Sequence, residues 1–254
     1  MLAFLHHHLP DNSLNSLKKA IDSGKVRING KTEKFHASPV GARDTVEIEL
    51  VAPISKMIDV LHEDDTFLIV NKPSGIVSES VKKGDLCHRL DKETSGCLLI
   101  AKTKEALKAG EALFKEKEIT KTYLAVVEGV PSKDSGTISK PLGKKGSLKG
   151  QTVWGVDENG LSALTFWKKI KSKGRISLIE CEPKTGRTHQ IRIHLASIGH
   201  PILGDHTYHK TQSFSKSSPR ILLHAYRLSF THPITGKEVH AEAPIPKEIE
   251  EPFL

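Results

Sequence analysis

The sequence predicts an α+β protein with a small N-terminal domain, residues 1–50, and a large domain, residues 57–254, joined by a linker at residues 51–56. A chain of 254 residues can bury a sizeable core, and its length favours a large domain plus a small one over a single unit. Segments of alternating apolar and polar residues follow one another in pairs, as in antiparallel hairpins, and amphipathic helices lie between them. In the linker, Pro53 interrupts an otherwise alternating strand.

The composition indicates a polyanionic partner. The net charge is +8 and the pI is about 9.3, which favours nucleic acid or an acidic membrane surface. No apolar run approaches the length of a membrane span, and the apolar start of the chain is too short for a signal peptide. The cysteines, Cys87, Cys97 and Cys181, show neither disulfide nor zinc spacing, so we expect a reducing, cytoplasmic environment.

Basic residues cluster in the predicted small domain. Ser13 can cap a helix that runs to about Ser23, and the following Asn29-Gly30 is a strong signal for a β-hairpin. Between positions 18 and 34 the acidic residues are Asp22 and Glu33, and the basic residues are Lys18, Lys19, Lys25, Arg27, Lys31 and Lys34. The end of the helix and the hairpin are therefore expected to carry a concentrated positive charge.

The stretch His88-Arg-Leu-Asp-Lys-Glu-Thr-Ser-Gly96 contains the candidate catalytic residue, Asp91. It follows a predicted hairpin of residues 57–61 and 66–71 and precedes a buried strand at residues 97–101. If the backbone is extended here, the side chains of Arg89 and Asp91 point to the same side. Taken alone, this spacing is more typical of a charged surface turn than of an active site.

The later part of the chain alternates between strands and helices. In order, we expect a helix from Thr103 to about Lys117, a strand at residues 121–127, a hairpin at residues 162–169 and 175–181, and a helix from Thr188 to Gly199. Residues 140–150 are rich in glycine and lysine and contain no acid. This composition predicts a mobile loop that is either solvated or in contact with an RNA backbone.

The sequence contains no recognisable cofactor or metal site. It lacks a phosphate-binding loop and a dinucleotide fingerprint, and His189 and His194 are five positions apart, unlike the pair in a His-Glu-x-x-His zinc site. The histidines at positions 6–8 are more often solvated than metal-bound in such a terminal segment. Glycoside hydrolysis by the usual route needs two carboxylates, and Glu93, near Asp91, is better placed to support the turn. We therefore expect cofactor-free chemistry on an anionic polymer.

Five segments in order resemble the RluA family of RNA pseudouridine synthases. They are Asn71-Lys-Pro-Ser-Gly-Ile-Val77, His88-Arg-Leu-Asp-Lys-Glu-Thr-Ser-Gly96, Lys121-Thr-Tyr-Leu-Ala125, Ala163-Leu-Thr-Phe-Trp167 and Gly186-Arg-Thr-His-Gln-Ile-Arg-Ile-His194. The resemblance implies an α+β domain with a mixed, mainly antiparallel central sheet and flanking helices. It also implies the reaction: uridine in RNA loses its N-glycosidic bond, the base rotates, and C5 joins C1′.

The resemblance also implies roles for individual residues. Asp91 is catalytic, and Arg192 pairs with it and favours its ionised form. Tyr123 faces the target base, where its hydroxyl could handle the C5 proton. The uridine must be flipped out of its helix, and Arg89 would fill the space or hold the displaced strand. Residues 71–77 support the catalytic loop, and residues 199–205 serve packing.

The first fifty residues resemble an S4 RNA-binding domain. The predicted RNA contacts are Lys18, Lys19, Lys25, Arg27 and Lys31. The alternative is a basic cap that does not bind RNA. An S4-like domain favours large-subunit ribosomal RNA as the target, with transfer RNA as the alternative.

A non-catalytic RNA-binding assembly factor is the alternative function. Such a protein would be expected to lack Asp91, Tyr123 or Arg192, and all three are present. We therefore expect a cytoplasmic, monomeric RNA pseudouridine synthase that needs neither cofactor nor metal and binds no membrane.

Overall fold

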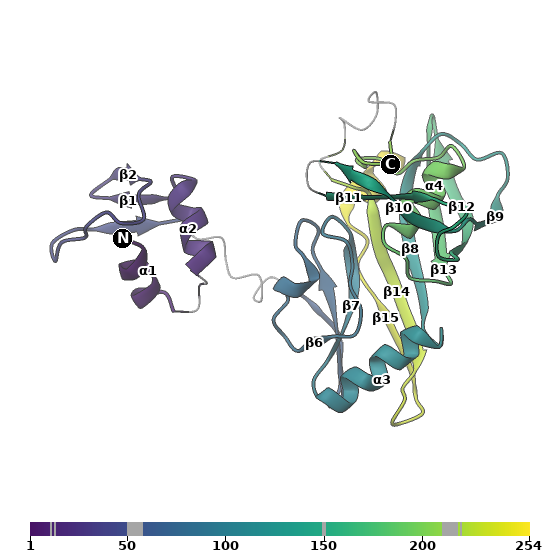
Figure 1. Cartoon of the computed structure of the whole chain (residues 1–254), viewed down its shortest axis with the longest axis horizontal. Helices are drawn as coiled ribbons and strands as arrows, with labels where there is room; N and C mark the ends of the chain where they lie inside the picture. The colour runs from purple at the N-terminus through teal and green to yellow at the C-terminus, as the bar shows by residue number, and fades with distance from the viewer. Residues whose placement is uncertain (11, 13, 50–57, 149–150, 210–217, 219) are drawn as a thin grey trace. The chain divides into compact units, whose positions relative to one another are not determined.

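The computed structural model describes residues 1–254 apart from residues 11, 13, 50–57, 149–150, 210–217 and 219. The chain divides into two compact units, Met1–Met57 and Ile58–Leu254 (Figure 1). The predicted linker at residues 51–56 lies outside the described residues. Each unit has its own buried apolar cluster.

The N-terminal unit combines two helices with a small antiparallel sheet. The elements are α1 (Leu2–His8), α2 (Leu14–Asp22), β1 (Val26–Ile28), β2 (Lys31–Glu33) and β3 (Val46–Ile48), and the strand order is β2-β1-β3. Leu17 and Ile21 of α2 are buried with Val26 of β1. Asn29 and Gly30 have φ angles of 50° and 79°, which a two-residue turn between β1 and β2 requires. The predicted hairpin is confirmed.

An additional helix precedes the predicted one in this unit. Helix α1 buries Leu5 in the core of the unit, and its last turn consists of the three histidines at positions 6–8. In the described part of the chain, these histidines do not form part of any His, Cys, Asp or Glu cluster that could hold a metal. Helix α2 begins at Leu14, and its predicted cap, Ser13, lies outside the described residues.

The larger unit is built on one ten-stranded sheet. Its strands are β4 (Val60–Glu63), β5 (Phe67–Lys72), β6 (Asp85–Leu86), β7 (Ser95–Ala101), β8 (Thr120–Glu128), β9 (Ser135–Ser139), β12 (Leu164–Lys173), β13 (Ile176–Pro183), β14 (Leu223–Thr231) and β15 (Glu238–Glu242). The main path runs β4-β5-β7-β14-β8-β13-β12-β9, with β6 beside β7 and β15 beside β14. Among these described strands, β7 and β14 pair in parallel and the other pairs are antiparallel. The prediction of a mixed, mainly antiparallel sheet is confirmed.

The middle of the sheet positions the stretch that contains the predicted catalytic residue, Asp91. Ala225 of β14 lies opposite Gly96 of β7 on one side and opposite Tyr123 of β8 on the other. A Cβ atom at Gly96 would lie 2.1 Å from the Ala225 carbonyl oxygen, and the φ angle of Gly96 is 111°. Only glycine fits this close approach of two strands. The loop that ends at β7 is therefore brought next to Tyr123.

Helices cover parts of the sheet. Helix α3 (Lys104–Lys115) buries Ala106 and Leu113 against Phe67 of β5, and Thr103 caps it by accepting a hydrogen bond from the Ala106 N–H at 3.1 Å, as predicted. Helix α4 (Gln190–Ser197) lies near β13. Shorter helical segments are η2 (Ser78–Ser80), α6 (Lys247–Glu250) and η3 (Glu251–Phe253). None of the helices in the described ranges is long and apolar enough to span a bilayer.

The basic, glycine-rich stretch is largely a hairpin. Strands β10 (Leu142–Leu148) and β11 (Gln151–Val156) pair with each other in a separate two-stranded sheet. The prediction of a mobile loop is therefore wrong for this stretch, except that residues 149–150 lie outside the described residues. The register shifts next to Gly146, whose φ angle is 153°, so this glycine marks a bulge. Lys145 also pairs with Asp157 at 3.2 Å, which reduces the positive charge of the hairpin.

Candidate active site

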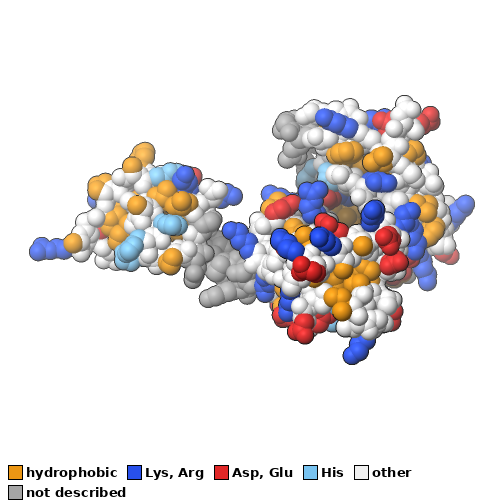
Figure 2. Space-filling view, turned by 60° about the horizontal axis from the view of Figure 1, so that its bottom comes forward, with side chains coloured by type: hydrophobic (Ala, Val, Ile, Leu, Met, Phe, Trp, Pro, Cys, Tyr) orange, Lys and Arg blue, Asp and Glu red, His pale blue; other side chains and the backbone are white. Residues whose placement is uncertain are grey.

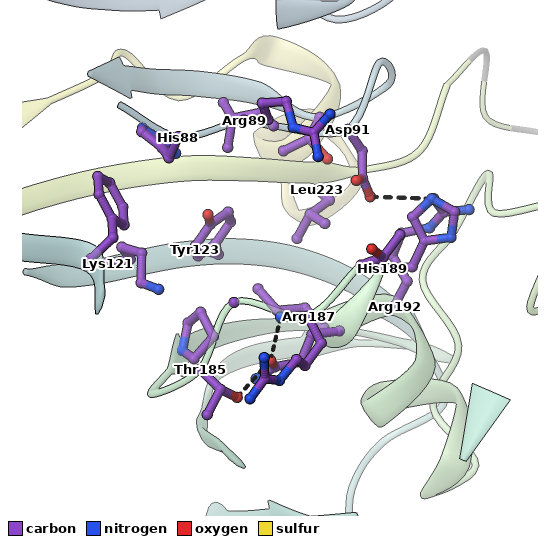
Figure 3. Close-up of a pocket in the computed structure, with 18 of the residues that line it drawn as sticks. His88, Arg89, Asp91, Lys121, Tyr123, Thr185, Arg187, His189, Arg192 and Leu223 are labelled. Atoms are coloured by element: carbon purple, nitrogen blue, oxygen red, sulfur yellow. Dashed lines mark hydrogen bonds and ion pairs between the residues drawn. The ribbon is translucent and has the colours of Figure 1, made fainter. Parts of the chain in front are cut away.

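One pocket of the larger unit contains the predicted catalytic residues. Its volume is about 810 Å³, and its lining includes the loop around Asp91, the start of β8 and residues 182–192. Asp91, Tyr123, Arg192 and Arg89 all line it (Figure 3). Asp91 and Arg192 are 101 positions apart in the chain, so the fold, rather than local sequence, brings them together.

Hydrogen bonds from a neighbouring turn fix the loop that carries Asp91. The Ser78 hydroxyl donates to the Leu90 carbonyl and accepts from the Leu90 N–H, each at 3.0 Å. The Ser74 hydroxyl donates to the Glu93 carbonyl at 2.7 Å. Within the loop, the Thr94 N–H donates to the Asp91 carbonyl at 3.0 Å. The supporting role predicted for residues 71–77 is confirmed by these contacts, and Ser78 adds to it.

Lys72 is fully buried beneath the same loop. Its ammonium donates to the carbonyl oxygens of Pro73, Ile76 and Lys92 at 3.0, 2.8 and 3.2 Å. Burial lowers the pKa of Lys72 to about 8, and the nearby carboxylates oppose this shift. Because one charged donor binds main-chain carbonyls on both sides, it holds the turn and the loop that carries Asp91 together.

Arg192 joins Asp91 to a second carboxylate, Asp205. Its Nε and Nη2 donate to Asp205 at 2.7 and 3.0 Å, and its Nη1 donates to Asp91 Oδ2 at 3.3 Å. The side chains of Arg192 and Asp205 are 7% and 1% exposed, whereas that of Asp91 is 28% exposed. Burial tends to lower the pKa of Arg192, but its hydrogen bonds to Asp205 and the charges of both carboxylates raise it overall. A permanently charged, fixed guanidinium therefore faces Asp91. The predicted contact between Arg192 and Asp91 is present.

The role of Asp205 differs from the prediction. The segment that contains it was expected to serve packing, but its carboxylate binds Arg192 and accepts from the N–H groups of Thr207 and Tyr208 at 3.0 and 3.2 Å. A buried arginine needs a carboxylate whose other lone pairs are also satisfied. The need of a buried Arg192 for a carboxylate partner is the signal that could have led to Asp205.

The start of helix α4 also differs from the prediction. Thr188 is not its cap: the N-cap is His189, which makes no side-chain capping bond. Instead, the Gln190 side-chain oxygen accepts from the Arg187 N–H at 3.0 Å and from the Thr185 hydroxyl at 2.7 Å. The first helical residue thus folds the preceding segment back onto the helix.

His189 is directed into the pocket by an unusual backbone conformation. Its φ angle is 56°, which is uncommon for a residue other than glycine. Its Nδ1 shares a hydrogen bond with the Tyr208 hydroxyl at 2.8 Å, and its Nε2 lies 3.9 Å from Asp91 Oδ2. Burial and the charge of Arg192 lower the pKa of His189, so the ring is neutral at neutral pH. His189 and Tyr208 are further residues of the site to which the sequence assigned no role.

Tyr123 lies between the two ends of the pocket, with Lys121 and His88 on one side and Asp91 and His189 on the other (Figure 3). Burial raises the pKa of Tyr123, and the charge of Asp91 acts in the same direction. The hydroxyl therefore stays protonated at neutral pH. The aromatic ring offers a surface on which a base can stack.

Basic side chains surround the pocket. Arg89 is 77% exposed and lies 3.5 Å from Glu79, so it forms part of the pocket edge. Further basic residues that line the pocket are Lys92, Lys115, Lys117, Lys121, Lys184 and Arg187. Figure 2 shows Lys and Arg side chains gathered around a hollow on this face of the larger unit. Such a distribution attracts a polyanion.

Asp91 is the acid that remains available for chemistry in this pocket. The other acids that line it, Glu79 and Glu182, pair with Arg89 and Lys184. Within the described ranges, no group of His, Cys, Asp and Glu side chains could hold a metal ion. The arrangement therefore combines one oriented carboxylate, an aromatic ring and a basic edge, which suits acid–base or nucleophilic chemistry on a flipped-out base.

Comparison with known proteins identifies the family. The RNA pseudouridylate synthase family matches residues 78–197, which include Asp91, Tyr123 and Arg192. An uncharacterized RNA pseudouridine synthase of Synechocystis is 32% identical over 280 residues, which cover 97% of this chain and 86% of that protein. The chain belongs to the RNA pseudouridine synthase family. This synthase therefore isomerises uridine to pseudouridine in RNA.

Further relatives and solved structures agree. Ribosomal large subunit pseudouridine synthase C of Salmonella typhi is 33% identical, with 97% of this chain and 89% of that protein covered. Ribosomal large subunit pseudouridine synthase D of Zymomonas mobilis is 32% identical, with coverages of 94% and 87%. The structure of human RNA pseudouridylate synthase domain containing 1 matches with a TM-score of 0.66 and 28% identity over 78% of this chain and 86% of that one.

The basic residues predicted to contact RNA in the N-terminal unit of this synthase do not share one face. Lys18 and Lys19 are exposed on α2, Lys25 and Arg27 lie at β1, and Lys31 lies on β2. Arg27 is opposite Thr32 in the hairpin, whereas Lys31 is opposite Ile28. Because neighbouring positions of a strand face opposite sides, Arg27 and Lys31 project from different faces.

Two of these basic residues lie beside acids, one within strand β3 and one directly after it. Lys25 Nζ is 3.9 Å from Glu49 Oε1, and Arg27 is opposite Glu47 in the strand register. Residues directly opposite each other on antiparallel strands have side chains on the same face. Lys25 and Arg27 are therefore partly neutralised, and Lys18, Lys19 and Lys31 are better placed to contact a phosphate backbone.

Proposed function

We propose that this synthase modifies uridine in large-subunit ribosomal RNA and that Asp91 is its catalytic residue. The observation that carries the assignment of Asp91 is its 3.3 Å contact with the buried Arg192 inside the pocket. Relatives that bear the names ribosomal large subunit pseudouridine synthase C and D align with 97% and 94% of the chain, which supports ribosomal RNA as the substrate class.

In the proposed reaction, Arg192 orients the Asp91 carboxylate toward the flipped-out nucleotide. Arg192 can do so because Asp205 binds two of its nitrogens and so prevents the guanidinium from rotating away with the substrate. A pocket of about 810 Å³ is large enough for a nucleoside. The exposed Arg89 at the edge would occupy the space that the base leaves in the RNA helix.

In this proposal, Tyr123 positions the base. Its ring can stack on uracil, and its protonated hydroxyl can donate a hydrogen bond. Since its raised pKa keeps the phenol neutral, stacking and donation are better supported than removal of the C5 proton. The N-terminal unit would act as an S4-like RNA-binding domain whose exposed lysines contact phosphates.

The test of the catalytic assignment is the variant Asp91→Asn, which preserves size and removes the charge. Release of tritium from C5-tritiated uridine in a ribosomal RNA fragment should fall by at least about a thousandfold, because the single oriented carboxylate is lost. RNA affinity should be unchanged. Glu105→Gln, on an exposed position of α3, is the matched control and should behave as the wild type.

The target is tested by mapping pseudouridine in total RNA from cells with and without the gene. A site lost from large-subunit ribosomal RNA is the expected result. Loss of a site in transfer RNA alone would show that the substrate class is wrong. Appreciable tritium release by Asp91→Asn would show instead that another group performs the chemistry.

A further inference from the structure

Lys121 is a charged residue of the pocket that the roles proposed for Asp91, Tyr123 and Arg192 leave unused. It lies on β8 two positions before Tyr123, and both residues line the pocket (Figure 3). Alternate residues of a strand face the same side and are separated by about 6.6 Å. The Lys121 side chain and the Tyr123 ring can therefore contact one ligand together.

The surroundings of Lys121 do not neutralise its charge. Its Nζ lies 5.8 Å from the centroid of the Phe114 ring, and no carboxylate pairs with it in the part of the chain that the structure describes. Burial lowers the pKa of Lys121, and the charge of Lys184 lowers it further. An ammonium group without an anionic partner in such a place costs folding free energy. A cation in this situation is suited to a ligand that supplies the missing negative charge.

The depth of Lys121 distinguishes it from the basic residues at the pocket edge. Lys184 pairs with Glu182, and the largely exposed Arg89 lies beside Glu79, so each of these two basic residues already has an acidic neighbour. Lys121 is half-buried, and its charge contributes to the low pKa of the half-buried His88. A base stacked on Tyr123 would reach this position, whereas the charged phosphate backbone would remain at the edge.

We propose that the ammonium of Lys121 donates a hydrogen bond to a carbonyl oxygen of the flipped uracil and stabilises the negative charge that forms on the base. The inference rests on the proposed function. When the bond between C1′ and N1 breaks, its electron pair leaves with uracil and is shared by N1 and the carbonyl oxygens. Lys121 keeps its proton in this step. When C5 then bonds to C1′, the C5 proton leaves to a base and N1 gains a proton, so the composition of the nucleotide is unchanged.

The first test is Lys121→Met, which keeps the length and apolar stem of the side chain. Folding should not suffer, because an unpaired, partly buried charge is removed, and thermal unfolding checks this. The single-turnover rate at saturating RNA should fall about 100-fold, as for other preorganised donors to a developing anion. RNA affinity should not change. Lys108→Met, at an exposed position of α3, is the matched control and should have the wild-type rate.

The second test measures the same single-turnover rates on an RNA that carries 5-fluorouridine at the target position. The reaction is monitored by the disappearance of 5-fluorouridine. Fluorine withdraws electrons and stabilises the uracil anion, so the defect of Lys121→Met should become at least about tenfold smaller than with uridine. Equal defects on both RNAs together with weaker binding would show that Lys121 holds a phosphate and would overturn the proposal. A wild-type rate for Lys121→Met would also overturn it. An inactive wild-type protein would instead count against uridine isomerisation itself, and so against both proposals.

Discussion

The two units use positive charge in different ways, as the Arg192–Asp205 pair and the Lys25–Glu49 pair illustrate. The first pair has a shortest separation of 2.7 Å with side chains 7% and 1% exposed, and the second a separation of 3.9 Å with side chains 38% and 81% exposed. A buried bidentate pair has one geometry and is little affected by salt. An exposed pair contributes at most about 1 kcal/mol and is screened. We therefore propose that charge in the larger unit orients reacting groups, whereas charge in the N-terminal unit attracts RNA.

The variant Arg192→Leu would disturb this contrast most. It leaves Asp205 buried without its cation and Asp91 free to rotate, so the free energy of unfolding should fall by about 3–5 kcal/mol. The single-turnover rate should fall by at least about 100-fold through the misplaced carboxylate. Urea unfolding and tritium release measure the two effects. Lys25→Leu is the counterpart in the N-terminal unit and should change stability by less than about 1 kcal/mol. Wild-type stability and rate in Arg192→Leu would refute the orienting role.

A smaller effect is expected from Asp205→Asn, which weakens the support of Arg192 but leaves its contact with Asp91. The rate at saturation should fall by roughly 10- to 100-fold, with RNA affinity unchanged, because the guanidinium can then shift relative to Asp91. Asp85→Asn provides a control, since Asp85 pairs with Lys104 on the surface at 2.7 Å and is outside the pocket. If both variants have the wild-type rate, the contact with Asp91 alone is sufficient to hold Arg192.

The sequence predicts the contact between Asp91 and Arg192 but not the partner that makes it rigid. Motifs around both residues resemble one family, and that family implies their contact. Asp205 comes near Arg192 only when the turn after Ile202 folds back onto α4, and no local pattern marks that closure. The N-cap of helix α4 was also predicted wrongly. The prediction relied on the residue type of Thr188, whereas the long side chain of Gln190 supplies the hydrogen bonds.

Local turn and cap signals in the sequence predicted the structure better than amino-acid composition did. The hairpin at Asn29-Gly30 and the cap at Thr103 could be predicted because a single backbone conformation or hydrogen bond decides each of them. Residues 140–150 were expected to form a mobile loop because they are rich in glycine and lysine and contain no acid. In the structure, Gly146 forms the bulge of the hairpin, so glycine here permits the strand pairing instead of ending it.

The buried Lys72 predicts that the free energy of unfolding depends on pH. Its pKa is lowered to about 8 in the folded protein, whereas an unfolded lysine has a pKa of about 10.4. Below pH 8 both states are protonated and the full cost of burying the charge is present. Between the two values the unfolded chain binds more protons, so stability rises with pH. Relative to Lys72→Met, the wild type should gain about 2 kcal/mol between about pH 7.5 and 10 in urea unfolding. Parallel pH profiles would show that the three carbonyls fully compensate the burial.

The exposed charges of the N-terminal unit should have the smallest effect, and it should appear in binding alone. We consider a full-length variant in which Gln replaces the exposed basic residues Lys18, Lys19, Arg27 and Lys31. Removing one phosphate contact should reduce the slope of log affinity against log salt by about 0.7 for single-stranded RNA, and affinity should fall about tenfold in all. The saturated single-turnover rate should not change, because Asp91 and its partners belong to the other unit. Binding at several salt concentrations and single-turnover kinetics measure these quantities.

A charge-matched control decides whether the position of these charges matters. It replaces lysines of the larger unit that are exposed and outside the pocket, Lys108, Lys133, Lys168 and Lys237. Both variants lose the same net charge, so a purely general attraction would weaken binding and flatten the salt dependence equally. A larger loss in the N-terminal variant is expected, because direct phosphate contacts release counterions and distant charges do not. A lower saturated rate with an unchanged salt slope would place the N-terminal unit at the active site, and the contrast between orienting and attracting charge would then fail.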